Sequence, residues 1–452
     1  MFTKVLVANR GAVAARVLRA LYELRIKSVA VYSEADYGAP YLEMASETQA
    51  IGPAPAAESY LNQTRLVEAI KRCGADGVHP GYGFLSENAA FAQRVIDAGV
   101  CFIGPAPKWI DAMGHKTRAR DIAREHGMPL SEGSGVLSAE PEAILAAARR
   151  IGYPVLVKPA GGGGGIGMLP ARNEAELLAT VERSRSLASR GFDNAEVYLE
   201  RLIEKPRHVE FQVLGDQHGA AVHLYERDCS TQRRNQKVIE EAPAPAIARS
   251  DLDAMADKVA AMVRGMGYDN IGTVEMLYGA DGSFSFLEMN TRLQVEHGVT
   301  EAVTGVDLVH AQIRSAAGER LADILPEKRT LSGHAIQARI YAEDPKNFFP
   351  SPGRLKVFRL PEDKAIRVET GYAEGRDVTP FYDPMIAKVI VHEATRERAI
   401  ERLIEALRAV DIQGVKHNVP AVLTVLDSGA FRDGDVHTGI IPQVMAQKKA
   451  AA

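Results

Sequence analysis

The first hundred residues alternate short apolar runs with segments whose apolar positions recur at helical spacing. Apolar runs at 5–8, 28–32, 77–79 and 100–104 predict four strands, and the pattern at 13–24 predicts a helix after the first of them. Strands and helices that alternate with short connections predict a parallel sheet wound by helices. The turn after the first strand lacks a full Gly-x-Gly-x-x-Gly pattern, which argues against a dinucleotide site.

The pattern changes beyond about residue 130. An apolar strand at 154–159 leads into five consecutive glycines at 161–165, and a further strand is predicted at 195–200. Between 208 and 213 apolar and polar side chains alternate, which predicts an antiparallel sheet with one face exposed to a cleft. A helix near the C-terminus is predicted from the shared apolar face of Ile400, Leu403, Ile404 and Leu407. The fold class is therefore α/β combined with α+β.

Length and composition narrow the class of protein. A chain of 452 residues is too long for one ordinary core, so two or three subdomains are expected. A hydrophobic fraction of 46% is typical of a globular enzyme, and a net charge of −4 argues against binding of nucleic acid. Three scattered cysteines predict neither a disulfide framework nor a metal cluster. With no export signal and no membrane-spanning apolar run, we expect a cytoplasmic protein without a membrane partner.

The glycine run is the first candidate for chemistry. Glycines have no Cβ, so a loop of them can approach a phosphate chain and present backbone N–H groups to it. Lys158, at the end of the preceding strand, would add a positive charge. A flexible linker is the alternative, but the run lies directly between a strand and resumed structure. We favour a phosphate-covering loop, and not a Walker loop, since no Gly-Lys-Ser/Thr follows.

A predicted hairpin supplies the second candidate. Segments 272–277 and 283–290 flank an Asp-Gly pair at 281–282, which is preferred in two-residue hairpin turns. If that turn sets the register, Glu275 lies opposite Glu288 on the same face. Two carboxylates this close repel each other unless a cation joins them.

A row of polar residues continues from this hairpin. Its members share one parity, so an extended chain places them on one face: Glu288, Asn290, Arg292, Gln294 and Glu296. Asn290 adds an oxygen ligand beside the two glutamates, which suits Mg²⁺, or Mn²⁺ as the alternative ion, holding ATP phosphates. The competing interpretation is the solvated face of an edge strand. The uninterrupted polar row favours a metal–nucleotide site.

The third candidate is the charged segment 226–238. Alone, such a segment is typical of a surface or a nucleic-acid patch, but Tyr225 is the only aromatic residue nearby. Arginine and lysine that converge on a small anionic substrate agree better with the other motifs.

With these motifs placed, the sequence resembles the biotin carboxylase family, which belongs to the ATP-grasp enzymes, over almost its whole length. The matching blocks are 8–11, 79–88, Lys158 with its glycine run, 207–210, 226–237, 288–297 and 333–345. The resemblance implies an ATP-grasp fold in three parts. They are an N-terminal doubly wound parallel-sheet domain at 1–114, an ATP-grasp domain at 115–330 with an inserted Gly-rich lid at about 131–204, and a C-terminal antiparallel-sheet domain at 331–447.

The resemblance also implies ATP- and bicarbonate-dependent carboxylation of biotin through carboxyphosphate. The implied ATP contacts are Lys116, Lys158, Gly163, Gly164, Gly165, Glu200, Ile203, His208, Gln232 and Leu277. The implied metal ligands are Glu275, Glu288 and Asn290. Bicarbonate is assigned to Lys237, Arg292, Gln294 and Val295. The implied catalytic residues are Lys237, Arg292, Glu296 as general base and Arg339, which stabilises charge on carboxyphosphate and on the ureido oxygen of biotin.

Departures from the family pattern bear on the carboxyl acceptor. Ala12, Ile166 and Asn235 replace residues that are usual in acyl-CoA-linked members, and the motifs are closest to the biotin carboxylase part of urea and guanidine carboxylases. No Met-Lys-Met occurs, so we expect biotin on a separate carrier protein or domain, together with a carboxyltransferase. A homodimer is also implied.

Two other functions stay open. One is a different ATP-grasp carboxylate–amine ligase, which would share the lysines, the loop and the carboxylates. The other is a catalytically silent ATP-binding subunit of a carboxylase complex.

Overall fold

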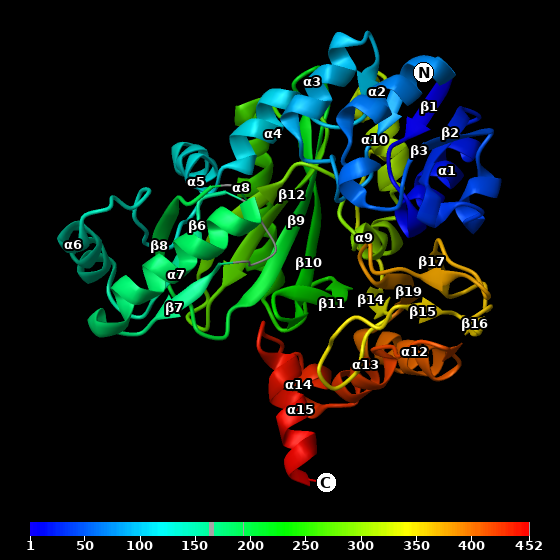
Figure 1. Ribbon diagram of the computed structural model, residues 1–452. Coiled ribbons are helices and arrows are strands. Elements are labelled where there is room, and N and C mark those ends of the chain that lie inside the picture. Colours follow the sequence, from blue (N-terminus) through cyan, green and yellow to red (C-terminus); the bar gives the residue numbers. More distant parts are fainter. Residues whose placement is uncertain (162–166, 193, 452) are drawn as a thin grey trace.

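A computed structural model describes residues 1–161, 167–192 and 194–451 (Figure 1). The N-terminal part is a parallel sheet of order β3-β2-β1-β4-β5. Its strands are β1 Lys4–Val7, β2 Lys27–Ser33, β3 Glu47–Gly52, β4 Gly77–His79 and β5 Cys101–Phe102, and its helices are α1 Gly11–Glu23, α2 Gln63–Cys73 and α3 Ala89–Asp97. The four predicted strands and the first helix are confirmed. Strand β3 was missed because its outer positions are exposed, so it lacks an apolar run.

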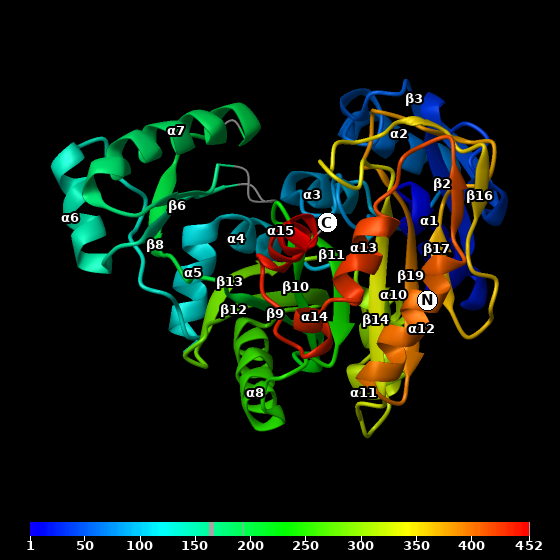
Figure 2. The same cartoon turned by 90° about the horizontal axis from the view of Figure 1, so that it is seen from below.

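A small unit with its own core stands apart from the rest of the molecule (Figure 2). Two helices lead into it, α4 Pro107–Gly114 and α5 Lys116–Glu125. Its sheet has the order β7-β6-β8, and α6 Pro141–Ile151 and α7 Glu174–Phe192 belong to the same unit. The strands are β6 Val155–Pro159, β7 Leu169–Ala171 and β8 Val197–Arg201. Between β6 and β7 lies the glycine run, of which Gly163, Gly164 and Gly165 are outside the described residues.

The largest element is an antiparallel sheet of order β13-β12-β9-β10-β11-β14-β19-β17. Its strands are β9 Arg207–Gly215, β10 Ala221–Arg233, β11 Gln236–Ala242, β12 Ile271–Tyr278, β13 Phe284–Asn290, β14 His334–Tyr341, β17 Arg367–Thr370 and β19 Met385–Glu393. Because β11 pairs with β14, one sheet spans the predicted boundary between residues 330 and 331. The domain limits stay a prediction.

Helices cover this sheet and complete the C-terminal part. The main ones are α8 Arg249–Met266, α9 His297–Thr304, α10 Leu308–Ala316, α12 Arg396–Arg408, α13 Val419–Leu426 and α15 Ile440–Ala451. Short elements are α11 Leu321–Ile324, α14 Gly429–Arg432, β15 Gly353–Arg354, β16 Val357–Arg359, β18 Asp377–Val378 and β20 Asp411–Gln413. The predicted C-terminal helical face is confirmed, since its four apolar residues are buried in α12. Within the described part of the chain, no helix is long and apolar enough to span a bilayer.

The alternating strand β9 differs from its prediction. Its apolar residues pack in the core that includes α8, as expected. The opposite face was expected to be exposed to a cleft, yet Glu210 and Gln212 are fully buried, and only His208 lines a cavity. The correction has a physical reason: Arg227 extends across this face and donates to both Glu210 Oε1 and Gln212 Oε1, at 2.6 and 2.8 Å.

The hairpin β12–β13 has the predicted pairing of Glu275 with Glu288, but its turn is longer than predicted. Gly279 N donates to Ser283 O at 2.9 Å, so the loop comprises residues 280–282 and is not a two-residue turn. Gly282, with φ +79°, supplies the left-handed position that such a loop requires. This loop shifts the register by one residue, and a bulge at Leu287 shifts it back. Glu275 therefore pairs with Glu288, as predicted, because two local deviations cancel.

Gly371 is the point where the C-terminal part touches the start of α1. A Cβ built on it would lie 2.3 Å from Gly11 Cα and 2.3 Å from Gly11 C, both backbone atoms. Gly371→Ala should lower the free energy of unfolding by about 1–3 kcal/mol through overpacking. Gly135→Ala is the control, since a Cβ there meets nothing within 4 Å. Urea unfolding of both variants tests this, and equal stabilities would contradict the close approach.

Candidate active site

A cavity of about 840 Å³ lies where the N-terminal part, the small β6–β8 unit and the large sheet meet. Every site residue predicted from the sequence that the structure describes lines this cavity. They are Lys116, Lys158, Glu200, Ile203, His208, Gln232, Lys237, Glu275, Leu277, Glu288, Asn290, Arg292, Gln294, Val295, Glu296 and Arg339. Arg10 and Tyr82 from the N-terminal part and Asp383 from the C-terminal part also line it. The fold thus brings together segments that are distant in sequence.

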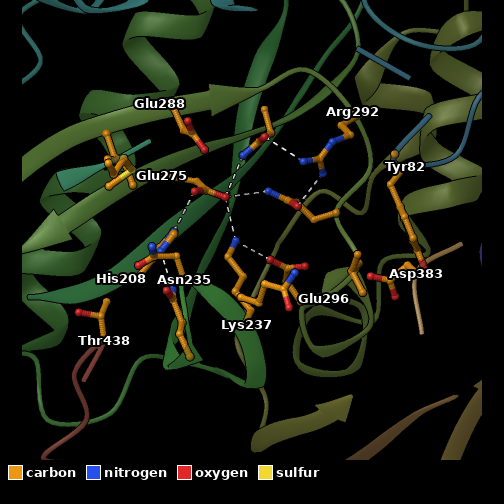
Figure 3. A pocket seen from close by; sticks show the side chains of 18 of the residues that line it. Tyr82, His208, Asn235, Lys237, Glu275, Glu288, Arg292, Glu296, Asp383 and Thr438 are labelled. Atoms are coloured by element: carbon orange, nitrogen blue, oxygen red, sulfur yellow. Dashed lines mark hydrogen bonds and ion pairs between the residues drawn. The ribbon is translucent and has the colours of Figure 1, made fainter. Parts of the chain in front are cut away.

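Lys237, at the start of β11, is the centre of the charged network (Figure 3). Its Nζ lies 2.5 Å from Glu210 Oε2, 2.8 Å from Glu275 Oε1 and 2.7 Å from Glu296 Oε1. Burial alone would lower the pKa of Lys237, but the three carboxylates outweigh it and raise that pKa well above its ordinary value. One ammonium group therefore joins carboxylates from three different elements.

The carboxylates around Lys237 differ in the direction in which their pKa values are shifted. Burial opposes the ionisation of Glu275 and Glu296, yet Lys237 and further donors hold the pKa of each well below its usual range. For Glu210, burial and the nearby charge of Glu296 raise the pKa. Burial and Glu296 thus oppose the ionisation of Glu210, whereas the cations favour the ionised forms of Glu275 and Glu296; Glu210 also forms an ion pair with Arg227.

Glu296 is held from its other side by Arg339 on β14. Arg339 Nη2 donates to Glu296 Oε2 at 2.9 Å, and Arg339 Nε donates to Glu240 Oε1 at 2.5 Å. Both oxygens of Glu296 therefore contact a cation, Lys237 at one and Arg339 at the other. The Cys229 thiol also donates to Glu296 Oε1, with 3.9 Å between Sγ and the oxygen, so two cations and a thiol orient this carboxylate.

The polar row after the hairpin was predicted as one extended face. Strand β13 ends at Asn290, so the residues that follow are not in a strand, which corrects the predicted geometry. The row is held together by Arg292, whose guanidinium donates to Asn290 Oδ1 at 2.9 Å and Gln294 Oε1 at 2.7 Å. Its Nε donates to Glu87 Oε2 of the N-terminal part at 2.7 Å. The side chains still line one cavity because hydrogen bonds, in place of a strand, orient them.

Two further lysines lie on the side of the cavity nearest the small β6–β8 unit. Lys116 Nζ donates to Glu288 Oε2 at 2.5 Å, and Lys158 Nζ donates to Glu200 Oε2 at 3.0 Å. Glu200 also accepts from Arg120 Nη1 at 2.8 Å, so it stays ionised between two cations, which lower its pKa against the effect of burial. Both lysines are positioned to meet an anionic group that enters between them.

Sequence reasoning missed several members of the network: Glu87, Arg120, Glu210, Arg227 and Glu240. Glu210 shares the parity of His208 on β9, which was a usable signal that it faces the same side. Glu240 pairs in register with Gln337 and lies near Arg339 only because β11 and β14 are neighbours. Nothing local in the sequence marks that neighbourhood.

The donor set at the hairpin fits a hard divalent cation. Glu275 and Glu288 are cross-strand partners, and Asn290 contributes an amide oxygen, which is the chemistry that Mg²⁺ prefers. Among the described residues, Glu288 Oε1 has no protein hydrogen-bond donor, while its Oε2 accepts from Lys116. His208 Nε2 lies 2.9 Å from Glu275 Oε2, and its Nδ1 accepts from Gln232 Nε2 at 2.9 Å.

Known proteins are similar to this chain over almost its whole length. Residues 1–110 match "Biotin carboxylase, N-terminal domain", residues 115–324 match "Carbamoyl-phosphate synthase L chain, ATP binding domain", and residues 337–443 match "Biotin carboxylase C-terminal domain". Biotin carboxylase 2 of Bacillus subtilis is 48% identical over 446 residues, which cover 98% of this chain and 100% of that protein. Biotin carboxylase of Halalkalibacterium halodurans is 47% identical over 441 residues, covering 98% and 97%.

A solved structure has the same fold as this chain. It is the biotin carboxylase domain dimer of 2-oxoglutarate carboxylase from Hydrogenobacter thermophilus, in complex with MgADP, ADP and bicarbonate. That chain is 43% identical, with a TM-score of 0.95 and coverage of 98% of this chain and 99% of that one. Fold and site define an ATP-dependent ligase with the ATP-grasp architecture. The chain belongs to the biotin carboxylase family.

Lys237→Met tests the charge balance of the cavity. Removing one partner of a buried ionic network costs about 3–5 kcal/mol, because the remaining charges are left uncompensated. The lowered pKa values of Glu275 and Glu296 stabilise the fold above their unfolded pKa of about 4.3, and this contribution is lost as pH falls through their folded pKa. The stability deficit of the variant should therefore be largest at neutral pH and shrink below about pH 4.3. Urea unfolding across pH measures it, and a pH-independent deficit would contradict the network.

Proposed function

We propose that this protein carboxylates biotin on a separate carrier, at the expense of ATP and with bicarbonate as the carbon source. The main support for the proposal is the ionised Glu296, which forms ion pairs with Lys237 and Arg339 beside the carboxylates of the hairpin. This places a base and two cations next to the group of residues that suits a metal–nucleotide complex. The H. thermophilus relative was crystallised with MgADP, ADP and bicarbonate, which supports a site that takes both a nucleotide and bicarbonate.

The nucleotide half of the cavity is assigned to the side nearest the small unit. Lys116 and Lys158 contact the phosphates of ATP, and Ile203 and Leu277 line the walls of the cavity near the adenine. Glu275, Glu288 and Asn290 hold Mg²⁺, which supplies charge neutralisation between the phosphates when it is bound. Gly163, Gly164 and Gly165 complete the assignment, as the loop that covers the phosphates and excludes water.

The bicarbonate half is assigned to Lys237, Arg292, Gln294 and the main chain of Val295. In the ligand-free arrangement Lys237 and Arg339 keep the pKa of Glu296 well below its usual range, against the effect of burial. An incoming bicarbonate anion contacts Lys237 and Arg292 and offsets part of this positive charge. The pKa of Glu296 then rises, which makes it a stronger base for the bicarbonate proton.

The chemistry then follows from the residues around the anion. Glu296 accepts the proton of bicarbonate, and the freed oxygen attacks the γ-phosphorus of ATP as ADP leaves. Carboxyphosphate breaks into CO₂ and phosphate, and phosphate accepts the proton of the ureido nitrogen, which attacks CO₂. Arg339 stabilises the negative charge on carboxyphosphate and on the ureido oxygen. Its fixed contacts with Glu240 and Glu296 hold it ready for this role.

Two other functions fit the geometry of the cavity less well. A carboxylate–amine ligase needs the lysines and the hairpin, but not a glutamate held between Lys237 and Arg339. A silent ATP-binding subunit needs neither half to be intact, yet every described member of the predicted set lines one cavity.

Glu296→Gln is the direct test of the proposal. The amide is nearly isosteric but cannot accept the bicarbonate proton, so biotin- and bicarbonate-dependent ADP release should fall at least about 100-fold. ATP binding, measured by calorimetry, should persist. Glu241→Gln is the matched control, because Glu241 is also buried, pairs with Arg396 and lies outside the cavity lining. Undiminished turnover in Glu296→Gln would overturn the assigned base.

The final acceptor and the partners form the finer part of the proposal. Urea, guanidine or a related amide is proposed over acyl-CoA, supported by the motif resemblance around Ile166 and Asn235. A carrier protein and a carboxyltransferase are proposed as partners, and a homodimer is proposed by analogy with the dimeric H. thermophilus domain. Reconstitution with the carrier and transferase, followed by assay of ¹⁴C-bicarbonate transfer, compares these acceptors. Transfer only to acyl-CoA would refute the amide acceptor and leave biotin carboxylation intact.

A further inference from the structure

A row of three charged residues crosses the C-terminal half of the large sheet. Arg339 on β14 is the cross-strand partner of Lys388 on β19, and Lys388 is the partner of Glu369 on β17. Directly paired residues on neighbouring strands have their side chains on the same face of the sheet. Arg339 donates to Glu296, the proposed base, so Lys388 lies beside the arginine that binds this base. Lys388 itself is fully buried and does not line the cavity.

Lys388 contacts the chain one residue before Glu296. Its Nζ donates to the backbone carbonyl of Val295 at 2.7 Å and lies 2.6 Å from Glu369 Oε2. The Val295 carbonyl belongs to the planar peptide group that joins Val295 to Glu296. This peptide plane also contains the backbone N and Cα of Glu296. A contact that fixes the Val295 oxygen therefore fixes the position from which the Glu296 side chain extends.

The preceding carbonyl is held in the same way. His297 Nδ1 lies 2.7 Å from Gln294 O, and burial lowers the pKa of His297 to about 4. The ring is therefore neutral at pH 7, and because a carbonyl only accepts, Nδ1 carries the proton. Two successive carbonyls are thus tied to buried donors, while the side chains of Gln294 and Glu296 line the cavity.

The contact from Lys388 is the stronger of the two. Hydrogen bonds from a charged donor are about twice as strong as neutral ones. Burial lowers the pKa of Lys388, and the opposing charge of Glu369 partly offsets that effect. Glu369 is itself shared with Arg367, and it keeps a pKa well below its usual range despite burial, chiefly through Lys388 and Arg367. The ion pair with Glu369 keeps the ammonium beside Val295.

We propose that Lys388 is a positioning residue for bicarbonate activation, which sets the Val295–Glu296 peptide so that the base and the main chain of Val295 face the anion together. This inference rests on the proposed function. Lys388 acts through the backbone and touches neither substrate. Its removal should impair the use of bicarbonate while leaving the nucleotide half of the cavity unchanged.

Lys388→Met is the first variant, because methionine has a similar length and no donor. The value of kcat/KM for bicarbonate should fall about 10- to 100-fold, as expected for the loss of a charged hydrogen bond. The KM for ATP should stay at the wild-type value. An unchanged kcat/KM for bicarbonate would overturn the proposal, and so would an equal loss in the constants for both substrates.

A double variant separates positioning from charge balance. Lys388→Met with Glu369→Gln removes both buried charges, so it restores neutrality without restoring the donor to Val295. The proposal requires the double variant to keep the bicarbonate defect, and recovery would show that Lys388 serves only to neutralise Glu369. The double variant also carries the test should the single one fail to fold. Arg396→Met, which breaks the buried pair with Glu241 away from the cavity, is the control for stability alone.

Failure of the proposed function gives a different result. In that case the wild type itself shows no bicarbonate-dependent ADP release with biotin. A crystal structure of the double variant then decides the inference: a displaced Val295–Glu296 peptide supports positioning, and an unchanged peptide overturns it.

Discussion

The ammonium group of Lys237 allows several buried carboxylates to lie close together at the cavity. Lys237 contacts Glu210, Glu275 and Glu296, which come from β9, β12 and the start of α9. Without that cation, carboxylates so close together in a buried place would repel one another or take up protons. The pairing of β9 with β12 and the connection into α9 both bring acidic side chains to this point. The geometry of the large sheet around the cavity therefore depends on this charge.

The same interaction prepares the site for an anion. Lys237 and Arg339 each contact one oxygen of Glu296, so the ligand-free cavity already has an ionised base with cations fixed beside it. Electrostatic stabilisation of this kind needs donors that are fixed before the reaction begins. Arg292, tied to Glu87 of the N-terminal part, and Arg339, tied to Glu240, provide such fixed donors. The N-terminal part thus contributes to the site through its contact with the polar row.

Local patterns predicted much of this protein for sound physical reasons. Apolar periodicity predicted four of the five strands of the parallel sheet and the helix α12, because burial requires one apolar face. The pairing of Glu275 with Glu288 was predicted for a two-residue turn, and it holds although the loop is longer, since the bulge at Leu287 restores the register. The exposed face expected for β9 was wrong, because Arg227 buries it. A turn rule cannot foresee a bulge, and an alternating pattern cannot show what covers a polar face.

The sequence by itself determined the fold class, through side-chain types and their spacing along the chain, and the family resemblance. That resemblance implied a set of site residues whose described members all line the cavity. Only the tertiary structure decided which charges meet. Glu210, Glu240 and Lys388 look like ordinary strand residues, and their partners lie far away in the sequence. An ion pair between neighbouring strands depends on strand order and burial, which are properties of the assembled sheet.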